Sequence, residues 1–178
     1  MAFSDIEALC KLTPEGREAL STRDKFNVTY SFEANSLPAS YDAATGNVTL
    51  DNTMSNAKLA SYFVHEMTHV RQQKLGKSVD VSNSDSDEFI KANVNEEFIA
   101  TAFQMQFFVR LDVGGYLNSI KPLTDKNAPP RYDQYKSAYN AGVTKMAGKG
   151  FDEEKLITAA LGNAISCLKY LFLRAAWV

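Results

Sequence analysis

The 178-residue chain is poor in the features that mark several common classes of protein. Its two cysteines, Cys10 and Cys167, are far apart and lack metal-type spacing, so we expect two reduced thiols in preference to a lone bridge. Basic residues are scattered and the formal net charge is −2, so the sequence has no basic stripe and nucleic acid is not an expected partner. No repeat or low-complexity segment appears, and the length suits a single domain over residues 1–178.

Long apolar segments of the kind found in membrane and Sec-exported proteins are also missing. The N-terminus has no basic region followed by an apolar core, so it does not have the pattern of a Sec signal peptide. In the apolar segment 152–178, the longest uncharged run, from Leu156 to Leu168, is too short to cross a bilayer. We expect a buried core helix there, with contact to a membrane or partner surface as the alternative. The protein is expected to be cytoplasmic as synthesised, and any export would use a non-classical route.

Histidine is scarce too, but the two that are present, His65 and His69, lie four residues apart with Glu66 directly after the first. On a helix a step of four residues turns roughly 400°, so both imidazoles lie on one face and can reach one ion. Two neutral imidazole nitrogens suit Zn²⁺. Glu66 is rotated by roughly 100° from His65, which places its carboxylate beside the metal as a general base and not on it. The alternative is a helix with two ordinary histidines and a surface glutamate.

The flanks of this motif favour the zinc interpretation. Ser55 or Asn56 can cap the start of the helix and Gly76 can end it, so the motif lies mid-helix. A catalytic zinc ion has three protein ligands and one open position, and the chain has no third histidine. The candidates for the third ligand are Glu96 and Glu97, in a second helix predicted over residues 88–111.

This pattern resembles the gluzincins, the glutamate-ligand branch of the zincin metallopeptidases. In that family a small residue commonly follows the ligand by three positions, which favours Glu97, followed by Ala100, over Glu96, followed by Ile99. The family often has an aspartate four residues after the ligand that orients a zinc histidine. This chain has Thr101 there, so the orienting group is left open.

The run from His65 to Gln73 also resembles metallopeptidase domains of bacterial secreted and effector proteins, over about residues 40–105. The resemblance implies a zinc metallopeptidase in which His65, His69 and Glu97 hold Zn²⁺. Glu66 would then activate water against a peptide bond of a protein or peptide substrate. Two alternatives stay open: a catalytically silent zinc-containing binding module, and a zinc hydrolase of a non-protein amide such as a peptidoglycan crosslink.

The expected fold is α+β and zincin-like, predominantly helical, with a small sheet preceding the active-site helix. Helices are predicted at residues 4–11 and from Pro14, which Thr13 caps. Strands are predicted at residues 26–32 and 48–51, with a loop around 36–41 and a turn at 45–47 between them. The resemblance implies an edge strand that pairs with substrate. Residues 48–51 are the candidate, and a covered or central strand is the alternative.

The C-terminal part offers candidates for stabilising the oxyanion of the transition state. A long loop is predicted over residues 121–131, and a helix that begins with Tyr132 and Tyr135 follows it. Because no histidine is left over, the donor must be a tyrosine, arginine, lysine or backbone N–H group. Tyr132 and Tyr135 are the two candidates, with a packing role as the alternative for each.

Overall fold

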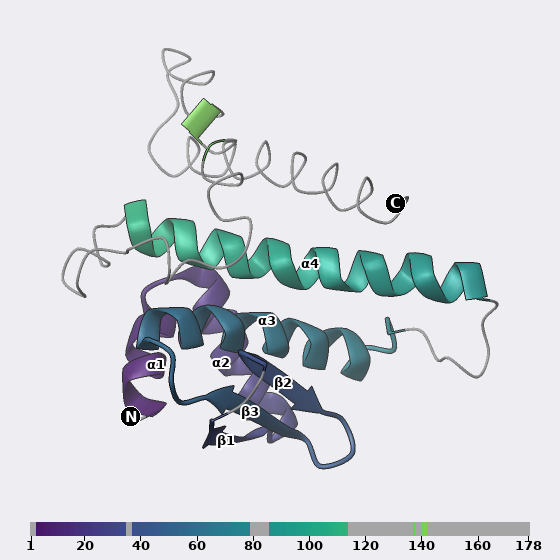
Figure 1. The fold of residues 1–178 in the computed structure, drawn as a ribbon, viewed down its shortest axis with the longest axis horizontal. Coiled ribbons are helices and arrows are strands. Elements are labelled where there is room, and N and C mark those ends of the chain that lie inside the picture. The colour runs from purple at the N-terminus through teal and green to yellow at the C-terminus, as the bar shows by residue number, and fades with distance from the viewer. Residues whose placement is uncertain (1–2, 35–36, 79–85, 114–136, 138–139, 142–178) are drawn as a thin grey trace. The chain divides into compact units, whose positions relative to one another are not determined.

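A computed structural model describes residues 3–34, 37–78 and 86–113, together with Ser137, Asn140 and Ala141 (Figure 1). The chain divides into two compact units, Met1–Pro129 and Pro130–Val178, and the expectation of a single domain stays a prediction. The described part of the first unit is α+β, with four helices and one small sheet. None of the helices in the described residues is both long enough and apolar enough to cross a membrane. The loop of residues 121–131 and the apolar segment 152–178 lie outside the described residues.

The first two helices form as their end signals predict. Helix α1 spans Phe3–Lys11 and helix α2 spans Pro14–Phe26. The hydroxyl oxygen of Thr13 accepts a hydrogen bond from the Gly16 N–H at 3.0 Å, which satisfies one of the free donors at the start of α2. Asn27 closes α2 in the left-handed conformation, with φ of 52°.

The first strand begins later than predicted. The prediction began at Phe26, but this residue is the last one of α2, and strand β1 spans Thr29–Glu33. Alternation of apolar and polar residues cannot separate the last residue of a helix from the first of a strand, whereas the left-handed Asn27 between them does.

The three strands form one sheet in the order β1-β3-β2. Strand β3, Asn47–Asp51, is parallel to β1 and antiparallel to β2, which spans Ala39–Asp42. The predicted edge position of residues 48–51 is therefore wrong, because β3 is hydrogen-bonded on both sides. The loop predicted around residues 36–41 is also wrong from Ala39 onward, because β2 begins there and pairs with β3 as a short edge strand. Its four residues are too few to show a recognisable alternation of apolar and polar side chains. The predicted turn is present, with Gly46 at φ of 68°.

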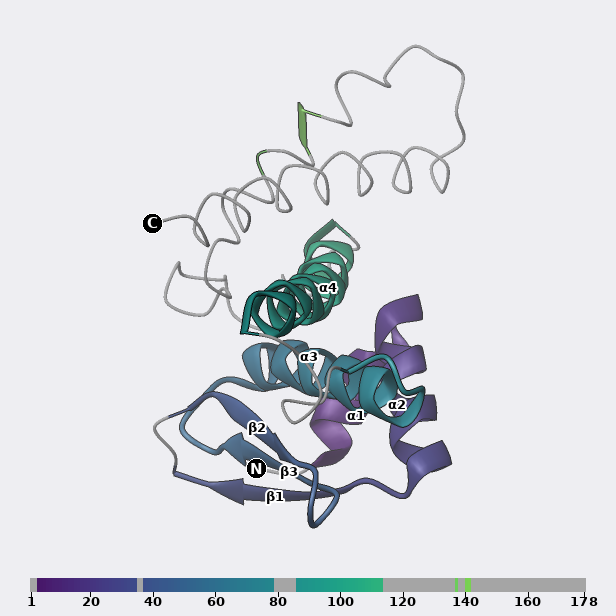
Figure 2. The same cartoon turned by 90° about the vertical axis from the view of Figure 1, so that its right-hand side faces the viewer.

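Helix α3, Asn56–Lys74, follows the sheet and carries the histidine motif (Figures 1 and 2). Ser55 caps its start, as predicted, and Gly76 adopts a positive φ of 65° just after its end. Helix α4, Ser86–Val113, runs antiparallel along α3, since Gln104 contacts Ser61 whereas Glu96 contacts Ser78. Helix α3 thus lies between α4 and the sheet, with α1 and α2 against its remaining side.

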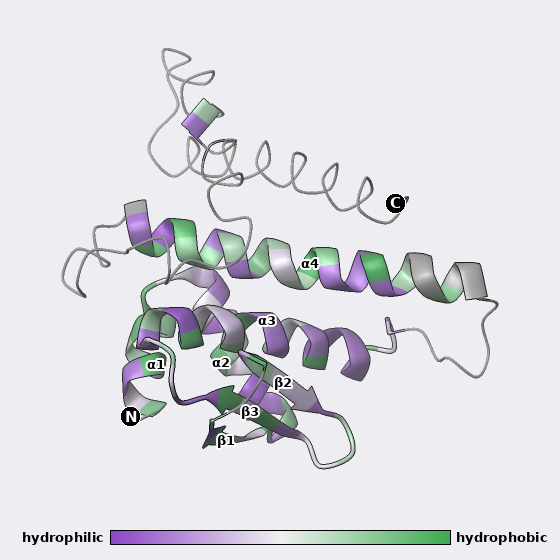
Figure 3. Ribbon diagram, viewed as in Figure 1, coloured by the Kyte–Doolittle hydropathy of each residue, from purple (hydrophilic) through white to green (hydrophobic). Residues whose placement is uncertain are grey.

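The core lies where these layers meet. Hydrophobic and hydrophilic residues are interspersed along α4 (Figure 3). This helix packs chiefly against α3, and several of its apolar residues are buried. The largest fully buried side chains come from α1, β3, α3 and α4: Ile6, Val48, Leu50, Leu59, Phe63, Met67, Met105, Phe107, Phe108 and Leu111. The face of α3 opposite α4 is therefore anchored in the sheet, so α3 is held from more than one side.

Cys10 belongs to this core and has a thiol that we expect to be inert. It is fully buried and not in a disulfide, and burial raises the pKa of its thiol from 9.0 to about 12, although the charge of Arg23 opposes the rise. Because the thiolate is the reactive form, the reactive fraction should fall by about 10³-fold at neutral pH. In a Cys167→Ser variant, thiol-specific labelling of the folded chain should be slower than that of the denatured chain by at least this factor. Equal rates would contradict the burial.

Candidate metal centre

The two histidines of α3 are brought together by the geometry of the helix. The Nε2 atoms of His65 and His69 are 3.0 Å apart, as expected of residues separated by one turn on the same face. Their side chains are mostly buried, with 14% and 18% of their surface exposed. On the other face of the helix, buried Met67 and Val70 pack into the core. The apolar residues of α3 thus fix the direction in which both imidazoles point.

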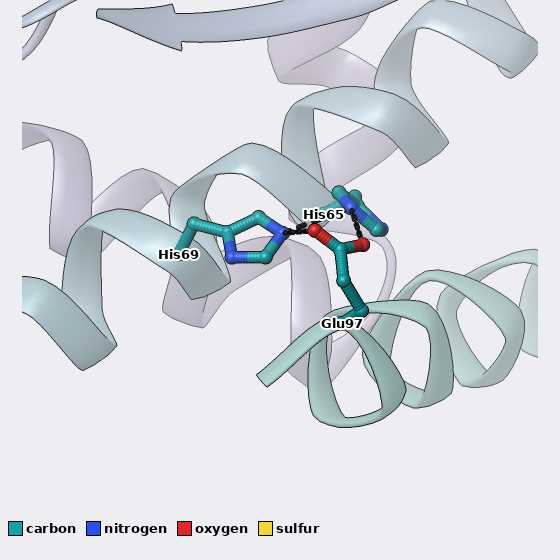
Figure 4. Close-up of side chains that lie close together, drawn as sticks. All are labelled: His65, His69 and Glu97. Atoms are coloured by element: carbon teal, nitrogen blue, oxygen red, sulfur yellow. Dashed lines mark hydrogen bonds and ion pairs between the residues drawn. The ribbon is translucent and has the colours of Figure 1, made fainter. Parts of the chain in front are cut away.

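Glu97 of α4 completes the cluster across the interface between the two helices. Its Oε2 lies 3.5 Å from Nε2 of His65, and its Oε1 lies 3.4 Å from Nε2 of His69. In Figure 4 the carboxylate of Glu97 points between the two rings from the neighbouring helix. The Glu97 side chain is 56% exposed, so the cluster opens toward solvent on the side of α4.

The spacing within this cluster fits a metal ion. Zinc–ligand distances of about 2.0–2.1 Å in a tetrahedral site put neighbouring ligand atoms about 3.3–3.4 Å apart. The two Nε2 atoms are 3.0 Å apart, and each lies 3.4 or 3.5 Å from a different oxygen of the Glu97 carboxylate, which is within a few tenths of an ångström of this value. With one ligand atom taken from each residue, all three atoms lie within 4.8 Å of one another. Two imidazole nitrogens and one carboxylate oxygen are also a donor set that catalytic zinc sites use. His65, His69 and Glu97 can therefore hold a metal ion, and they leave a fourth coordination position to solvent.

The electrostatics of the cluster keep Glu97 in its charged form. Hydrogen bonds from His65 and His69 hold the pKa of the Glu97 carboxyl well below its usual range, although partial burial opposes them. Burial by itself would lower the pKa of His69. Hydrogen bonds and charges from Glu97, Glu66 and Glu96 outweigh it and raise that pKa above its usual value. The site thus has an excess of negative charge, which favours a cation.

Glu66 is buried beside the histidines but does not belong to the group that could bind the metal. Burial raises the pKa of its carboxyl, while the charges of His65 and His69 lower it and that of Glu97 raises it further. The backbone N–H of Tyr41, on strand β2, donates a hydrogen bond to the Glu66 carboxylate and also lowers the pKa. The edge strand therefore lies against this carboxylate.

Glu96 occupies a different position from Glu97. Its Oε1 lies 3.4 Å from Nδ1 of His69, on the opposite side of the ring from Glu97, and the hydroxyl of Ser78 donates to the same oxygen at 2.8 Å. The sequence presented Glu96 only as an alternative ligand, and nothing in it pointed to Ser78 or to the backbone of Tyr41.

The sequence also drew attention to Tyr132, Tyr135 and Thr101. Tyr132 and Tyr135 lie outside the described residues. Within the described part of the chain Thr101 makes no hydrogen bond to the cluster, and the buried Nδ1 atom of His65 has no hydrogen-bond partner there. A carboxylate therefore lies beside Nδ1 of His69, whereas Nδ1 of His65 has no such neighbour among the described residues. No protein family matches the sequence, and comparisons with curated proteins and with solved structures likewise find no related chain.

Proposed function

We propose that the chain is a zinc-dependent metallopeptidase with a zincin-like arrangement, in which His65, His69 and Glu97 hold the ion and Glu66 is the general base. One observation carries the proposal: two imidazole nitrogens of α3 and the carboxylate of Glu97 on α4 converge, with one ligand atom from each residue within 4.8 Å of the others. Zinc is favoured because two imidazoles and a carboxylate with an open position suit its catalytic sites.

Glu66 has the features that a general base needs here. When bound, zinc would lower the pKa of water and polarise the scissile carbonyl. Glu66 follows His65 directly, so its carboxylate lies beside the ligand atoms, where it can accept a proton from the attacking water and pass it to the leaving amine. Its burial excludes bulk water from the carboxylate, and the backbone of Tyr41 lies beside it and favours its charged form.

Strand β2 supports a polypeptide as substrate. The Asp51 N–H donates to the Pro38 carbonyl at 3.0 Å, so by the antiparallel alternation the backbone groups of Ala39 and Tyr41 turn away from β3. Among the described residues no further strand pairs with this edge. Because the Tyr41 N–H faces Glu66, an extended peptide that hydrogen-bonds to the remaining outer groups, those of Ala39 and the carbonyl of Tyr41, would run past the general base.

Metal content and cleavage together test this proposal. We expect about one zinc per chain by elemental analysis after loading and desalting, because one group of residues in the described part of the chain could hold a metal ion. The loaded chain should generate new N-termini in a mixture of unfolded proteins, as identified by mass spectrometry, and a chelator should abolish them.

Each other outcome points to a different function. A chain that binds no zinc would overturn the metal site. Zinc binding without peptide cleavage, but with release of peptides from peptidoglycan, would indicate the amide hydrolase. Zinc binding with neither activity would indicate a catalytically silent module.

A further inference from the structure

Two adjacent acidic residues of α4, Glu96 and Glu97, contact His69 from two sides. Successive residues on a helix are rotated by roughly 100°, so Glu96 and Glu97 leave α4 in different directions. Glu97 reaches Nε2 of His69 at 3.4 Å, and Glu96 reaches Nδ1 of the same ring at 3.4 Å. Only 17% of the Glu96 side chain is exposed, compared with 56% for Glu97. The imidazole of His69 is therefore held between the two carboxylates.

Ser78 fixes the carboxylate of Glu96. Its hydroxyl donates to Oε1 of Glu96 at 2.8 Å, and the same oxygen faces Nδ1 of His69. Ser78 lies two residues after Gly76, whose positive φ turns the chain at the end of α3. Hydrogen bonds from Gly76 and Lys77 back to the last turn of α3 hold this turn in place. The turn thus brings Ser78 from the end of α3 to the side of α4.

We propose that Glu96, held by Ser78, is the positioning residue for His69, an inference that rests on the proposed zinc site. An imidazole that binds an ion through Nε2 must carry its proton on Nδ1, and an acceptor at Nδ1 fixes this tautomer and the ring orientation. Glu96 supplies that acceptor. His65 has no equivalent partner among the described residues, so this kind of acceptor is present at His69 and not at His65.

Ligation by Glu96 itself does not fit this geometry. Its carboxylate faces Nδ1 of His69, whereas the Nε2 atoms of both histidines face Glu97. For Glu96 to become a ligand, the ring of His69 would have to turn over and Nε2 would leave its position 3.0 Å from Nε2 of His65. Glu96 and Glu97 therefore have separate roles.

Zinc affinity and the protonation of His69 test the role of Glu96 in the full-length chain. In Glu96→Ala we expect zinc affinity, measured by competition with a chelator, to fall about 10–100-fold, as for other partners of metal-bound histidines. Ser78→Ala should cause a smaller loss in the same direction. Glu96→Gln keeps an acceptor oxygen and should recover part of the affinity. Asn95→Ala, at the exposed neighbouring position, should bind zinc like the wild type.

Nitrogen-15 NMR of the histidine rings measures the exchange of the Nδ1 proton directly, which a general loss of stability would not change. Because the chain has only two histidines, their ring signals can be assigned by replacing either one. In the zinc-loaded wild type, His69 should show a slowly exchanging proton on Nδ1. Glu96→Ala should exchange it rapidly, whereas Asn95→Ala should not.

Two results separate this inference from the proposed activity. Glu96→Ala with wild-type zinc affinity and an unchanged Nδ1 signal would overturn the positioning role and leave the peptidase intact. A wild-type chain that binds zinc and shows the Glu96 effects, but cleaves no peptide, would overturn the peptidase and leave the positioning role intact.

Discussion

Replacing Glu66 by glutamine is expected to lower the rate of peptide cleavage by about 10²–10⁴-fold while zinc content and fold are retained. The amide has nearly the same shape as the carboxylate and can still accept the hydrogen bond from Tyr41, but it cannot take a proton from water. Glu66 is buried and is not one of the three ligands, so the loss should appear in turnover and not in metal affinity. Cleavage rates of zinc-loaded protein, compared at equal metal content, measure the effect.

The matched control is Glu33→Gln, which makes the same chemical change at an exposed position of β1. It should leave zinc content, thermal unfolding and cleavage unchanged. A Glu66→Gln variant with full cleavage activity would remove Glu66 from the mechanism, and its proton acceptor would have to be sought elsewhere. Loss of zinc in the same variant would instead indicate that Glu66 contributes to binding the ion.

Glu97→Ala should abolish stable zinc binding, and cleavage with it, while the chain stays folded. The substitution removes the carboxylate that lies between the two Nε2 atoms, so two imidazoles remain as ligands. The loss of affinity should exceed the ~10–100-fold expected for a residue that only orients a ligand. Because the side chain is half-exposed and alanine is a good helix former, α4 should tolerate the change. Elemental analysis and circular dichroism report the two effects separately.

The zinc affinities of Glu96→Ala and Glu97→Ala, compared with each other, show which of the two residues is the ligand. Glu97→Ala should lose zinc at concentrations where Glu96→Ala still binds it, and Asn95→Ala should match the wild type. The reverse order, with Glu96→Ala the weaker binder, would transfer the ligand role to Glu96 and refute the assignment of Glu97.

Features set by neighbouring residues could be predicted from the sequence. Thr13 and Ser55 cap helices that begin where they indicate, and His65 and His69 share a helix face because their spacing is close to one turn. The convergence of Glu97 on these histidines depends on α4 packing against α3, and only the resemblance to gluzincins favoured Glu97 over Glu96. The ligand role itself stays a prediction.

Features set by long-range pairing could not be predicted. The central position of β3 follows from pairing with β1 on one side and β2 on the other, which no local pattern encodes. Strand β2 is too short to show a detectable alternation of apolar and polar residues, yet its backbone at Tyr41 lies against the Glu66 carboxylate. The contact of Ser78 with Glu96 likewise depends on where the turn after α3 brings the chain, so the partner of His69 became visible only in three dimensions.

Because the three proposed ligands lie on two helices, a bound ion would cross-link α3 and α4. His65 and His69 can come together within α3 alone, whereas Glu97 joins them only once α4 has docked alongside. An unfolded chain therefore has an incomplete site, and the free energy of binding is added to the stability of the docked helix pair. The supply of metal would thus determine how stably α4 stays packed on α3, as well as whether the site is active.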